Sequence, residues 1–327
     1  MTAIRIGTRG SALALWQARH VAARIRESAP DVVVELVEIA STGDRITDVP
    51  LADVEGTGFF TATLERALAD GRVDVAVHSY KDLPVDHTPG LVVAAVPPRG
   101  PVEDVLCVSP TLSTQSASSA AVVSPSAAAL MRLPRAARIG TCSARRTAQV
   151  QAMRPDLDLR PLRGNVPTRI GRLTSGELDA IVLARAGLVR LGLEAHISDV
   201  FPVNVMMPAP AQGALAVECR AADRELVGVL SRLDHQATRL AVDAERMVLH
   251  ALGGGCSVPV GATATVAPGE VTLAAGVFAF DRPNGVHAEV RGRDAAAVGR
   301  EAARRLLDLG AGEILASFGK VATGVRS

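Results

Sequence analysis

The chain has 327 residues, and its 35 Lys and Arg against 34 Asp and Glu give a formal net charge of +1. This length accommodates two or three domains, and a composition of 48% hydrophobic and 21% charged residues excludes a disordered chain. The near-zero charge excludes a protein that binds polyanions through its overall field. Only Lys81 and Lys320 are lysines, so the other 33 basic residues are arginines, whose planar fork suits carboxylates. We attribute most of these arginines to codon bias, and those beside candidate ligand-binding turns carry the functional signal.

The first residues run directly into a strand-like pattern, without a charged leader or an apolar signal core. No apolar run reaches the roughly 18–20 residues that span a membrane. Four widely spaced cysteines form no CxxC or Cys/His cluster, and they are Cys107, Cys142, Cys219 and Cys256. These features predict a cytoplasmic protein with free thiols and without a disulfide framework or a metal site.

Up to residue 219, short β-branched runs alternate with helical patterns along the chain. The predicted strands cover residues 4–7, 32–39, 73–77, 91–96, 139–141, 180–183 and 214–219. The predicted helices cover residues 12–27, 61–69, 144–153 and 168–173. Strands separated by helices are typical of α/β domains with parallel or mixed sheets.

An internal repeat divides this region in two. The run Arg5-Ile6-Gly7-Thr8 precedes a polar turn and a helix, and the run Arg138-Ile139-Gly140-Thr141 does the same. Later in each half, residues 71–77 and 176–182 share a pattern that leads from a glycine through an acidic residue into a strand. We therefore expect two similar α/β domains around a cleft, which is a common location for a small-molecule site.

Beyond residue 220 the pattern changes to helices at 226–233, 237–252 and 295–309 and strands at 258–266, 271–280 and 286–291. A strand meander with helices on one face predicts a smaller α+β domain. The predicted fold is thus α/β, with two similar α/β domains around a cleft, as in periplasmic binding proteins, and a smaller α+β C-terminal domain. The predicted boundaries are 1–99 with 200–219 for domain 1, 100–199 for domain 2 with a Ser/Ala-rich surface insertion at 109–129, and 220–327 for domain 3.

Two predicted helices begin with hydroxyl and arginine side chains, in Thr8-Arg9-Gly10-Ser11 and in Thr141-Cys142-Ser143-Ala144-Arg145-Arg146. A helix N-terminus offers free N–H groups and a positive dipole end, so both turns are candidate anion sites. Ordinary Ser/Thr capping with solvated arginines explains either turn alone. Two equivalent turns that face one cleft favour a bound polyanion.

The segment from His78 to Pro84 follows an apolar strand directly. Polar groups at the carboxyl end of such a strand lie where ligands bind in open α/β sheets. Asp82, next to Lys81, is therefore a candidate acid/base or counter-ion to a developing cation. A turn before Pro84, with Asp82 as a turn former, is the alternative, and both interpretations stay open at this point.

Three glycines precede Cys256, and Pro259 follows it shortly afterwards. This pattern predicts an exposed loop whose thiol is accessible for covalent attachment, although a lone cysteine is more often a buried apolar residue. A series of arginines lies between these motifs, at Arg145, Arg146, Arg163, Arg169, Arg185 and Arg190.

Together these motifs resemble the hydroxymethylbilane synthase family, also called porphobilinogen deaminases. The matching segments are RIGTRGSALALWQA, VDVAVHSYKDLPV, IGTCSARRTAQ, LRGNVPTRI, LDAIVLARAGLVRLGL, PAPAQGALAVECR and GGGCSVPVGA. They occur in the family's order and span nearly the whole chain, and only the tail beyond about residue 290 is not diagnostic.

The resemblance implies a transferase that condenses four porphobilinogen molecules head to tail and releases ammonia at each step. It implies that a dipyrromethane cofactor is held through a thioether to Cys256, and that Asp82 is the catalytic carboxylate, which stabilises the cation left when ammonia departs. Charge-assisted bonds to the acetate and propionate of each pyrrole would give affinity and register. The residues implied to bind cofactor or substrate are Arg9, Ser11, Phe60, Ser79, Lys81, Thr141, Ser143, Arg145, Arg146, Arg163, Arg169, Arg190 and Gln212.

This chain departs from the family's pattern in the segment 50–60, where Asp53, Glu55 and Thr57 stand in place of common basic residues, and at Thr42, where an arginine is common. The departures leave open how that loop handles the substrate's charges. Cys142 stands where the family often has serine, and a structural role is expected for it.

The expected partners are porphobilinogen and the growing oligopyrrole, with no nucleic acid and no membrane. We also expect a monomer in the cytoplasm that hands its product to uroporphyrinogen-III synthase. The main alternative is a cytosolic solute-binding module for a small polycarboxylate, because twin α/β domains around an arginine-lined cleft would also bind an anion. The third domain with Cys256 weighs against that alternative, and Asp82 with Cys256 weighs against a catalytically silent paralogue.

Overall fold

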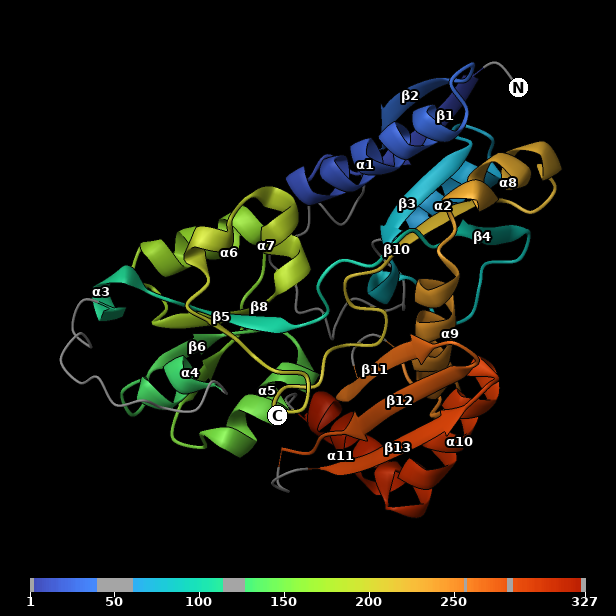
Figure 1. Cartoon of the computed structure of the whole chain (residues 1–327). Helices are drawn as coiled ribbons and strands as arrows, with labels where there is room; N and C mark the ends of the chain where they lie inside the picture. Colours follow the sequence, from blue (N-terminus) through green and yellow to red (C-terminus); the bar gives the residue numbers. More distant parts are fainter. Residues whose placement is uncertain (1–2, 40–60, 114–126, 256–257, 281–284, 325–327) are drawn as a thin grey trace.

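Three β-sheets organise the molecule (Figure 1), whose computed structural model describes residues 3–39, 61–113, 127–255, 258–280 and 285–324. The first sheet contains β1 (Ala3–Thr8), β2 (Val33–Glu38), β3 (Val75–Ser79), β4 (Leu91–Ala95) and β10 (Leu215–Arg220). The second sheet contains β5 (Asp104–Val108), β6 (Arg138–Gly140), β7 (Asp158–Arg160), β8 (Ala180–Ala184) and β9 (Asp199–Val200). The third sheet contains β11 (Val260–Ala267), β12 (Glu270–Val277) and β13 (Val286–Gly292). We refer to the parts built on these sheets as domains 1, 2 and 3.

The first two sheets have the same topology. Their strand orders are β2-β1-β3-β10-β4 and β7-β6-β8-β5-β9. In each sheet the first three strands are parallel, and the fourth strand, β10 or β5, runs antiparallel to both of its neighbours. The prediction of two similar α/β domains is therefore confirmed. In both cases the fourth strand follows a connection that crosses from the other domain.

The internal repeat of the sequence corresponds to a repeated ion pair. In domain 1, Arg5 donates from Nε and Nη2 to the Asp74 carboxylate at 2.9 and 2.8 Å, and from Nη2 to the Gly71 carbonyl at 2.9 Å. In domain 2, Arg138 makes the same three contacts, at 3.0 and 2.8 Å to Asp179 and 2.9 Å to the Gly176 carbonyl. The same side chains thus close the same turn in each domain.

Helices cover the sheets in an order close to the predicted one. Domain 1 contains α1 (Ala12–Ser28), α2 (Ala62–Ala69) and the 3₁₀ turn η2 (Tyr80–Asp82). Domain 2 contains α3 (Pro110–Ser113), α4 (Ala128–Arg132), α5 (Ala144–Met153), α6 (Val166–Thr174), α7 (Arg185–Leu191) and the 3₁₀ turn η3 (Glu194–His196). The remainder contains α8 (Arg224–Leu230), the 3₁₀ turn η4 (Ser231–Leu233), α9 (Gln236–Ala251), α10 (Ala295–Asp308) and α11 (Ala311–Gly324).

Several elements were not predicted. The strands β5, β7 and β9 and the helices α7 and α11 have no counterpart among the predicted ranges. β7 and β9 are only three and two residues long and have no clear apolar pattern, whereas β5 contains the apolar run at residues 105–108, which the sequence analysis overlooked. α11 follows Gly310, whose φ of 95° ends α10, so the predicted final helix is followed by one more.

The segment just after the predicted boundary at residue 220 packs with the first sheet. Leu226, Leu230 and Leu233 belong to the same buried cluster as Ile4 and Val217 of the first sheet. The segment that contains α8 and η4 therefore packs with domain 1, whereas the predicted boundary at residue 220 assigns it to domain 3. The physical reason is that α1 covers only part of the apolar face of the first sheet, and these leucines cover another part of it.

Domain 3 is an α+β unit as predicted. Its three antiparallel strands pack on α9, α10 and α11, and the buried cluster between them contains Val248, Leu273, Val298 and Ala302. In Figure 1, α9 runs from the base of domain 1 into domain 3. This helix is therefore the element that joins the two units.

Two chain crossings connect domains 1 and 2, at residues 96–103 and 201–214. They lie against one another where the Gly100 N–H donates to the Gly213 carbonyl at 3.1 Å. Gly213 has a φ of 84°, and a Cβ there would lie 2.5 Å from the Pro101 carbonyl oxygen. Only glycine permits this approach, so the glycine fixes how closely the crossings pass. Among the described residues, no helix combines the length and the apolarity that crossing a membrane requires.

Candidate functional site

The Asp82 turn lies at the carboxyl end of β3, where the sequence analysis places it. Tyr80 and Leu83 are buried, and the Leu83 N–H donates to the Tyr80 carbonyl at 3.3 Å, which closes the η2 turn. Lys81 is half-buried between them, and Asp82 is exposed. The apolar anchors thus hold the turn to domain 1 and leave the Asp82 carboxylate accessible.

The two predicted helix starts are capped by their hydroxyl side chains. Ser11 Oγ accepts from the Ala14 N–H at 3.3 Å, and Ser143 Oγ accepts from the Arg146 N–H at 3.4 Å. Thr141 Oγ1 accepts from the Ser143 N–H at 3.2 Å. These contacts are those of ordinary capping, and anion binding at either turn stays a proposal.

A buried carboxylate, Asp104, holds the arginine pair of domain 2. Arg146 donates to its Oδ1 from Nε and Nη2 at 3.1 and 2.7 Å, and Arg145 Nη1 lies 2.8 Å from Oδ2. Asp104 is fully buried, and Arg145 and Arg146 are 3% and 6% exposed. Burial alone would raise the pKa of the Asp104 carboxyl, but the two guanidiniums hold it well below its usual range. The sequence analysis missed Asp104.

Gln212 extends this cluster into domain 1. Its Nε2 donates to Asp104 Oδ1 at 2.9 Å and to the Val102 carbonyl at 2.8 Å, and its Oε1 accepts from Lys81 Nζ at 3.3 Å. The contacts form a continuous path from Arg146 in domain 2, through Asp104 and Gln212, to Lys81 beside Asp82. We call Lys81, Asp104, Arg145, Arg146 and Gln212 the cleft network.

Burial and nearby like charges lower the pKa values of cations in and beside this network. The pKa of Lys81 falls to about 8 because of its burial, which outweighs the opposing effect of Asp82, and the arginine charges lower it further. Burial also lowers the pKa of Arg169, as does the Arg146 charge, while Asp82 opposes the shift. Arg169 and Asp82 are therefore within electrostatic reach of one another across the two domains.

Four of the other implied binding residues lie outside the cleft network, namely Arg9, Ser79, Arg163 and Arg169. Arg9 and Arg163 are half-buried, at the start of α1 and just before α6 respectively. Arg169 Nε donates to the Gly164 carbonyl at 2.7 Å, and Ser79 Oγ accepts from Gln17 Nε2 at 2.7 Å. These contacts place the side chains but do not show what they bind.

Arg190 lies at the domain crossing rather than in the cleft network. Its Nη2 donates to the Gly213 carbonyl at 2.6 Å, and its guanidinium lies 5.7 Å from the centroid of the Trp16 ring. Burial lowers the pKa of Arg190 to about 10. Because Trp16 belongs to α1 and Arg190 to α7, this pair links domains 1 and 2.

Two site predictions lie outside the described residues, namely Phe60 and Cys256, as do the departures at Thr42 and in the segment 50–60. The other three cysteines are free thiols. Burial raises the pKa of Cys107 to about 12 and, as the largest cause, that of Cys219 to about 11, so both are poor nucleophiles at neutral pH. Cys142 is exposed in the turn that begins α5.

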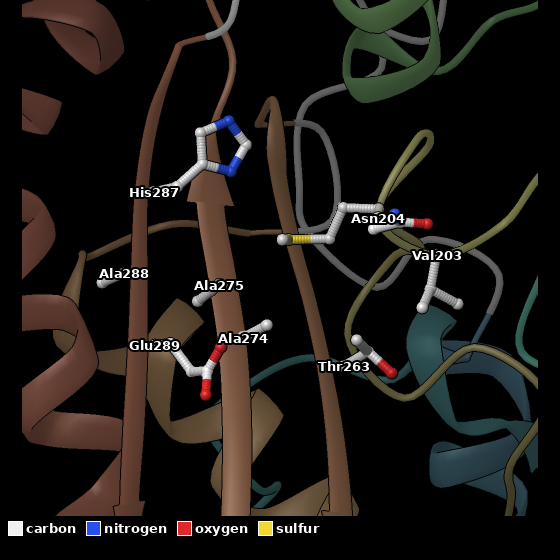
Figure 2. Close-up of a pocket in the computed structure, with 9 residues that line it drawn as sticks. Val203, Asn204, Thr263, Ala274, Ala275, His287, Ala288 and Glu289 are labelled. Atoms are coloured by element: carbon white, nitrogen blue, oxygen red, sulfur yellow. The ribbon is translucent and has the colours of Figure 1, made fainter.

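A pocket of about 310 Å³ lies at a different place, on the open face of the third sheet (Figure 2). His287 and Glu289 from β13 line it, together with Thr263 from β11 and Asn204 from the second domain crossing. The residues of the cleft network are not part of its lining. The pocket therefore does not contribute to the candidate site.

Comparison with known proteins agrees with this arrangement. A family model described as the dipyromethane cofactor binding domain of porphobilinogen deaminase matches residues 4–228, and one described as the C-terminal domain of that protein matches residues 239–308. The gap between the two matches contains η4 and the start of α9.

Full-length relatives bear the same name. The porphobilinogen deaminase of Syntrophomonas wolfei is 45% identical over 317 residues, which cover 96% of this chain and 98% of that protein. The porphobilinogen deaminase of Brevibacillus brevis is 44% identical over 313 residues, with 95% and 96% covered. Among solved structures, the periplasmic aliphatic sulphonate binding protein SsuA from Escherichia coli aligns with a TM-score of 0.39 at 14% identity, over 76% of this chain and 70% of that one. On the family matches and the full-length relatives, the chain belongs to the porphobilinogen deaminase family, and residues 4–228 are its dipyrromethane cofactor-binding domain.

Proposed function

We propose that the protein is a hydroxymethylbilane synthase, a transferase that joins four porphobilinogen molecules head to tail on a covalently held dipyrromethane cofactor and releases an ammonia for each. The observation that carries the proposal is the cleft network, which places a buried, organised set of cations next to the accessible carboxylate of Asp82. A simple anion-binding cleft has no need of a carboxylate at that place.

The charges of the site fit a ligand that brings carboxylates. Lys81, Arg145, Arg146 and Arg169 are within electrostatic reach of two carboxylates, those of Asp82 and Asp104. Burial is the largest cause that lowers the pKa values of Lys81 and Arg169, and the Arg146 charge lowers both further, so a bound carboxylate would stabilise their charged forms. The dipyrromethane unit carries acetate and propionate groups, which supply such charge.

We infer that Arg145, Arg146 and Lys81 hold the cofactor carboxylates and that Cys256 provides its thioether. When bound, the cofactor would supply the nucleophilic pyrrole carbon to which the first substrate is joined. Cys256 follows three glycines directly after α9, and two of the other thiols are buried and protonated at neutral pH. Burial thus argues against Cys107 and Cys219, and between Cys142, which is exposed, and Cys256 the glycine-rich segment GGGCSVPVGA, which resembles the family's attachment loop, supports Cys256.

The role proposed for Asp82 is electrostatic and acid–base. As the amine leaves porphobilinogen, positive charge develops on its pyrrole ring, and a fixed carboxylate beside the ring N–H stabilises that charge. The same carboxylate can accept the proton released after coupling. Its exposure on a turn held by buried Tyr80 and Leu83 suits both tasks, because the group stays in place while remaining accessible.

A binding assay combined with an ammonia assay tests the function. Incubating the purified protein with porphobilinogen should release one ammonia per substrate consumed and yield hydroxymethylbilane. The solute-binding alternative predicts saturable binding of porphobilinogen or of a related dicarboxylate with no ammonia. Binding without ammonia release would therefore replace the proposed function with that alternative.

The proposal extends to the setting of the reaction. We infer a cytoplasmic monomer whose product passes to uroporphyrinogen-III synthase, supported by membership of a tetrapyrrole-biosynthesis family. Size-exclusion chromatography with light scattering should give the mass of one chain, and a dimer would contradict the inferred monomer.

The Lys81 ammonium should impose an alkaline limit on carboxylate binding by the cofactor-free Cys256→Ser protein. With a pKa of about 8, instead of the ordinary 10.5, it is protonated below pH 8 and loses its charge above it, so carboxylate binding weakens as the pH rises. The affinity of this protein for porphobilinogen should be lower at pH 9 than at pH 7 by up to about tenfold through this group. When Lys81→Arg is added to this protein the guanidinium stays charged, so the two pH profiles of affinity should diverge only above pH 8. Titration of the substrate amine is common to both proteins, and parallel profiles would contradict the assignment.

A further inference from the structure

A single arginine of α9 holds the backbone of the Asp82 turn. Arg246 Nη1 donates to the Tyr80 and Leu83 carbonyls at 3.2 and 3.1 Å, and Nη2 donates to the Pro84 and Val85 carbonyls at 2.5 and 3.3 Å. Its guanidinium also lies 4.4 Å from the centroid of the Tyr80 ring. Arg246 is only 7% exposed. The contacted carbonyls belong to residues that precede and follow Asp82 in the chain.

The geometry of a guanidinium suits this task. A planar, rigid fork can donate to several carbonyls at fixed angles while stacking on an aromatic face, which the single ammonium of lysine cannot do. The short η2 turn has one internal backbone bond, from the Leu83 N–H to the Tyr80 carbonyl. Most of the directional restraint on the turn between Tyr80 and Val85 therefore comes from another part of the chain.

The helix that carries Arg246 also leads to the glycines before Cys256. α9 ends at Ala251, Gly253 takes a φ of 63°, and the Gly254 N–H donates back to the Leu249 carbonyl at 3.0 Å. Arg246 is thus within two turns of the end of the helix. The helix is anchored to the Asp82 turn at one point and continues into the segment that contains the proposed attachment cysteine.

We propose that Arg246 is a positioning residue that fixes the Asp82 carboxylate relative to α9, so that the helix leading to Cys256 sets the place of the catalytic group. The proposal rests on the proposed function for the role of Asp82 and Cys256, while the contacts that carry it are independent of that function. Arg246 does not touch the reacting atoms in this account. It acts through the backbone on which Asp82 is mounted.

The chain provides a matched control on the same helix. Arg239 of α9 donates to the Val93 carbonyl at 3.2 Å and pairs with Asp234 at 2.8 Å. Like Arg246, it anchors α9 to domain 1 through a backbone carbonyl, but its contacts are with β4 and not with the turn. A loss of helix anchoring in general should affect both variants, and a loss of turn positioning should affect only Arg246.

The test compares the full-length proteins Arg246→Gln, Arg246→Lys and Arg239→Gln with the wild type, using steady-state kinetics with porphobilinogen and amide hydrogen exchange over residues 79–86. Arg246→Gln should lower kcat by about 10- to 100-fold with KM within about twofold, because the carboxylate is misplaced while the binding cations are intact. Arg246→Lys should recover part of kcat. Amide hydrogens of the turn should exchange faster in Arg246→Gln than in the wild type, and their exchange rates should be unchanged in Arg239→Gln.

Three results would overturn the proposal. They are wild-type turnover in Arg246→Gln, unchanged exchange in the turn, and equal losses of kcat in Arg246→Gln and Arg239→Gln. If the wild type releases no ammonia from porphobilinogen, the proposed function fails, and hydrogen exchange alone then decides whether Arg246 fixes the turn.

Discussion

Asp82→Asn is expected to keep the fold, the covalent adduct and substrate binding, and to lose most of the turnover. The amide has the shape of the carboxylate but carries no charge, so it cannot stabilise the cation that forms as ammonia leaves and cannot accept the coupling proton. Loss of a positioned acid–base group costs about 10²- to 10⁴-fold in rate. We expect kcat to fall by this amount, with KM within a few-fold of the wild type, in an assay of ammonia release.

Asp86→Asn is the matched control for this experiment. Asp86 lies four residues further along the chain, and its side chain is 88% exposed near His250. It has the same carboxylate chemistry but lies outside the η2 turn and pairs with His250, so its variant should turn over at the wild-type rate. Near-normal turnover by Asp82→Asn, or an equal loss in both variants, would show that Asp82 is not the key carboxylate.

Asp104→Asn is expected to cause a large loss of stability. The carboxylate is fully buried, and both Arg145 and Arg146 pair with it, so its removal leaves two buried guanidiniums with a neutral partner. Breaking a buried ion pair by changing one partner costs about 3–5 kcal/mol in the free energy of unfolding. Since the pKa of Asp104 is held far below its usual range, this stabilisation should persist to strongly acidic pH. Chemical denaturation monitored by circular dichroism measures the change.

The control is Asp179→Asn, in the same domain. Asp179 also binds an arginine through two contacts, but its side chain and that of Arg138 are 20% and 42% exposed. Solvent screens this ion pair, so its loss should lower the free energy of unfolding by about 1 kcal/mol or less. If Asp104→Asn destabilises no more than Asp179→Asn, then Asp104 does not organise the arginine pair as described.

Much of the fold follows from local sequence patterns. The repeated Arg-Ile-Gly-Thr runs predict two similar domains, and the structure shows why the repeat is retained in both halves. Arg5 pairs with Asp74, and Arg138 pairs with Asp179, through the same set of contacts. The two partners are 69 residues apart in domain 1 and 41 residues apart in domain 2, so the pairs are visible in the sequence because both partners recur in two similar units and not because the contact is local.

The residues that the sequence analysis missed depend on contacts between distant segments. Asp104 lies 41 and 42 residues before the arginines that it holds, and it begins an antiparallel strand that reads as part of a domain connection. Arg246 contacts carbonyls more than 160 residues earlier. Neither residue has a local motif, since the partners of Asp104 meet it only when domain 2 folds, and those of Arg246 only when α9 packs on domain 1.

The packing of the segment after residue 220 was not predicted, for a related reason. The pattern changes at residue 220, but the leucines of α8 and η4 fill an apolar face of domain 1 that the sequence does not reveal. The helix starts at Ser11 and Ser143, in contrast, were predicted correctly because capping is a local interaction.

The central claim is that the chain carries its own pyrrole primer on Cys256, and intact mass spectrometry of the purified protein tests it most directly. The wild type should exceed its polypeptide mass by the mass of a two-pyrrole unit, and Cys256→Ser should have the bare mass and no synthase activity. Cys142→Ser, which changes an exposed thiol, should keep the adduct. A bare polypeptide mass in a wild-type protein with full synthase activity would contradict the account.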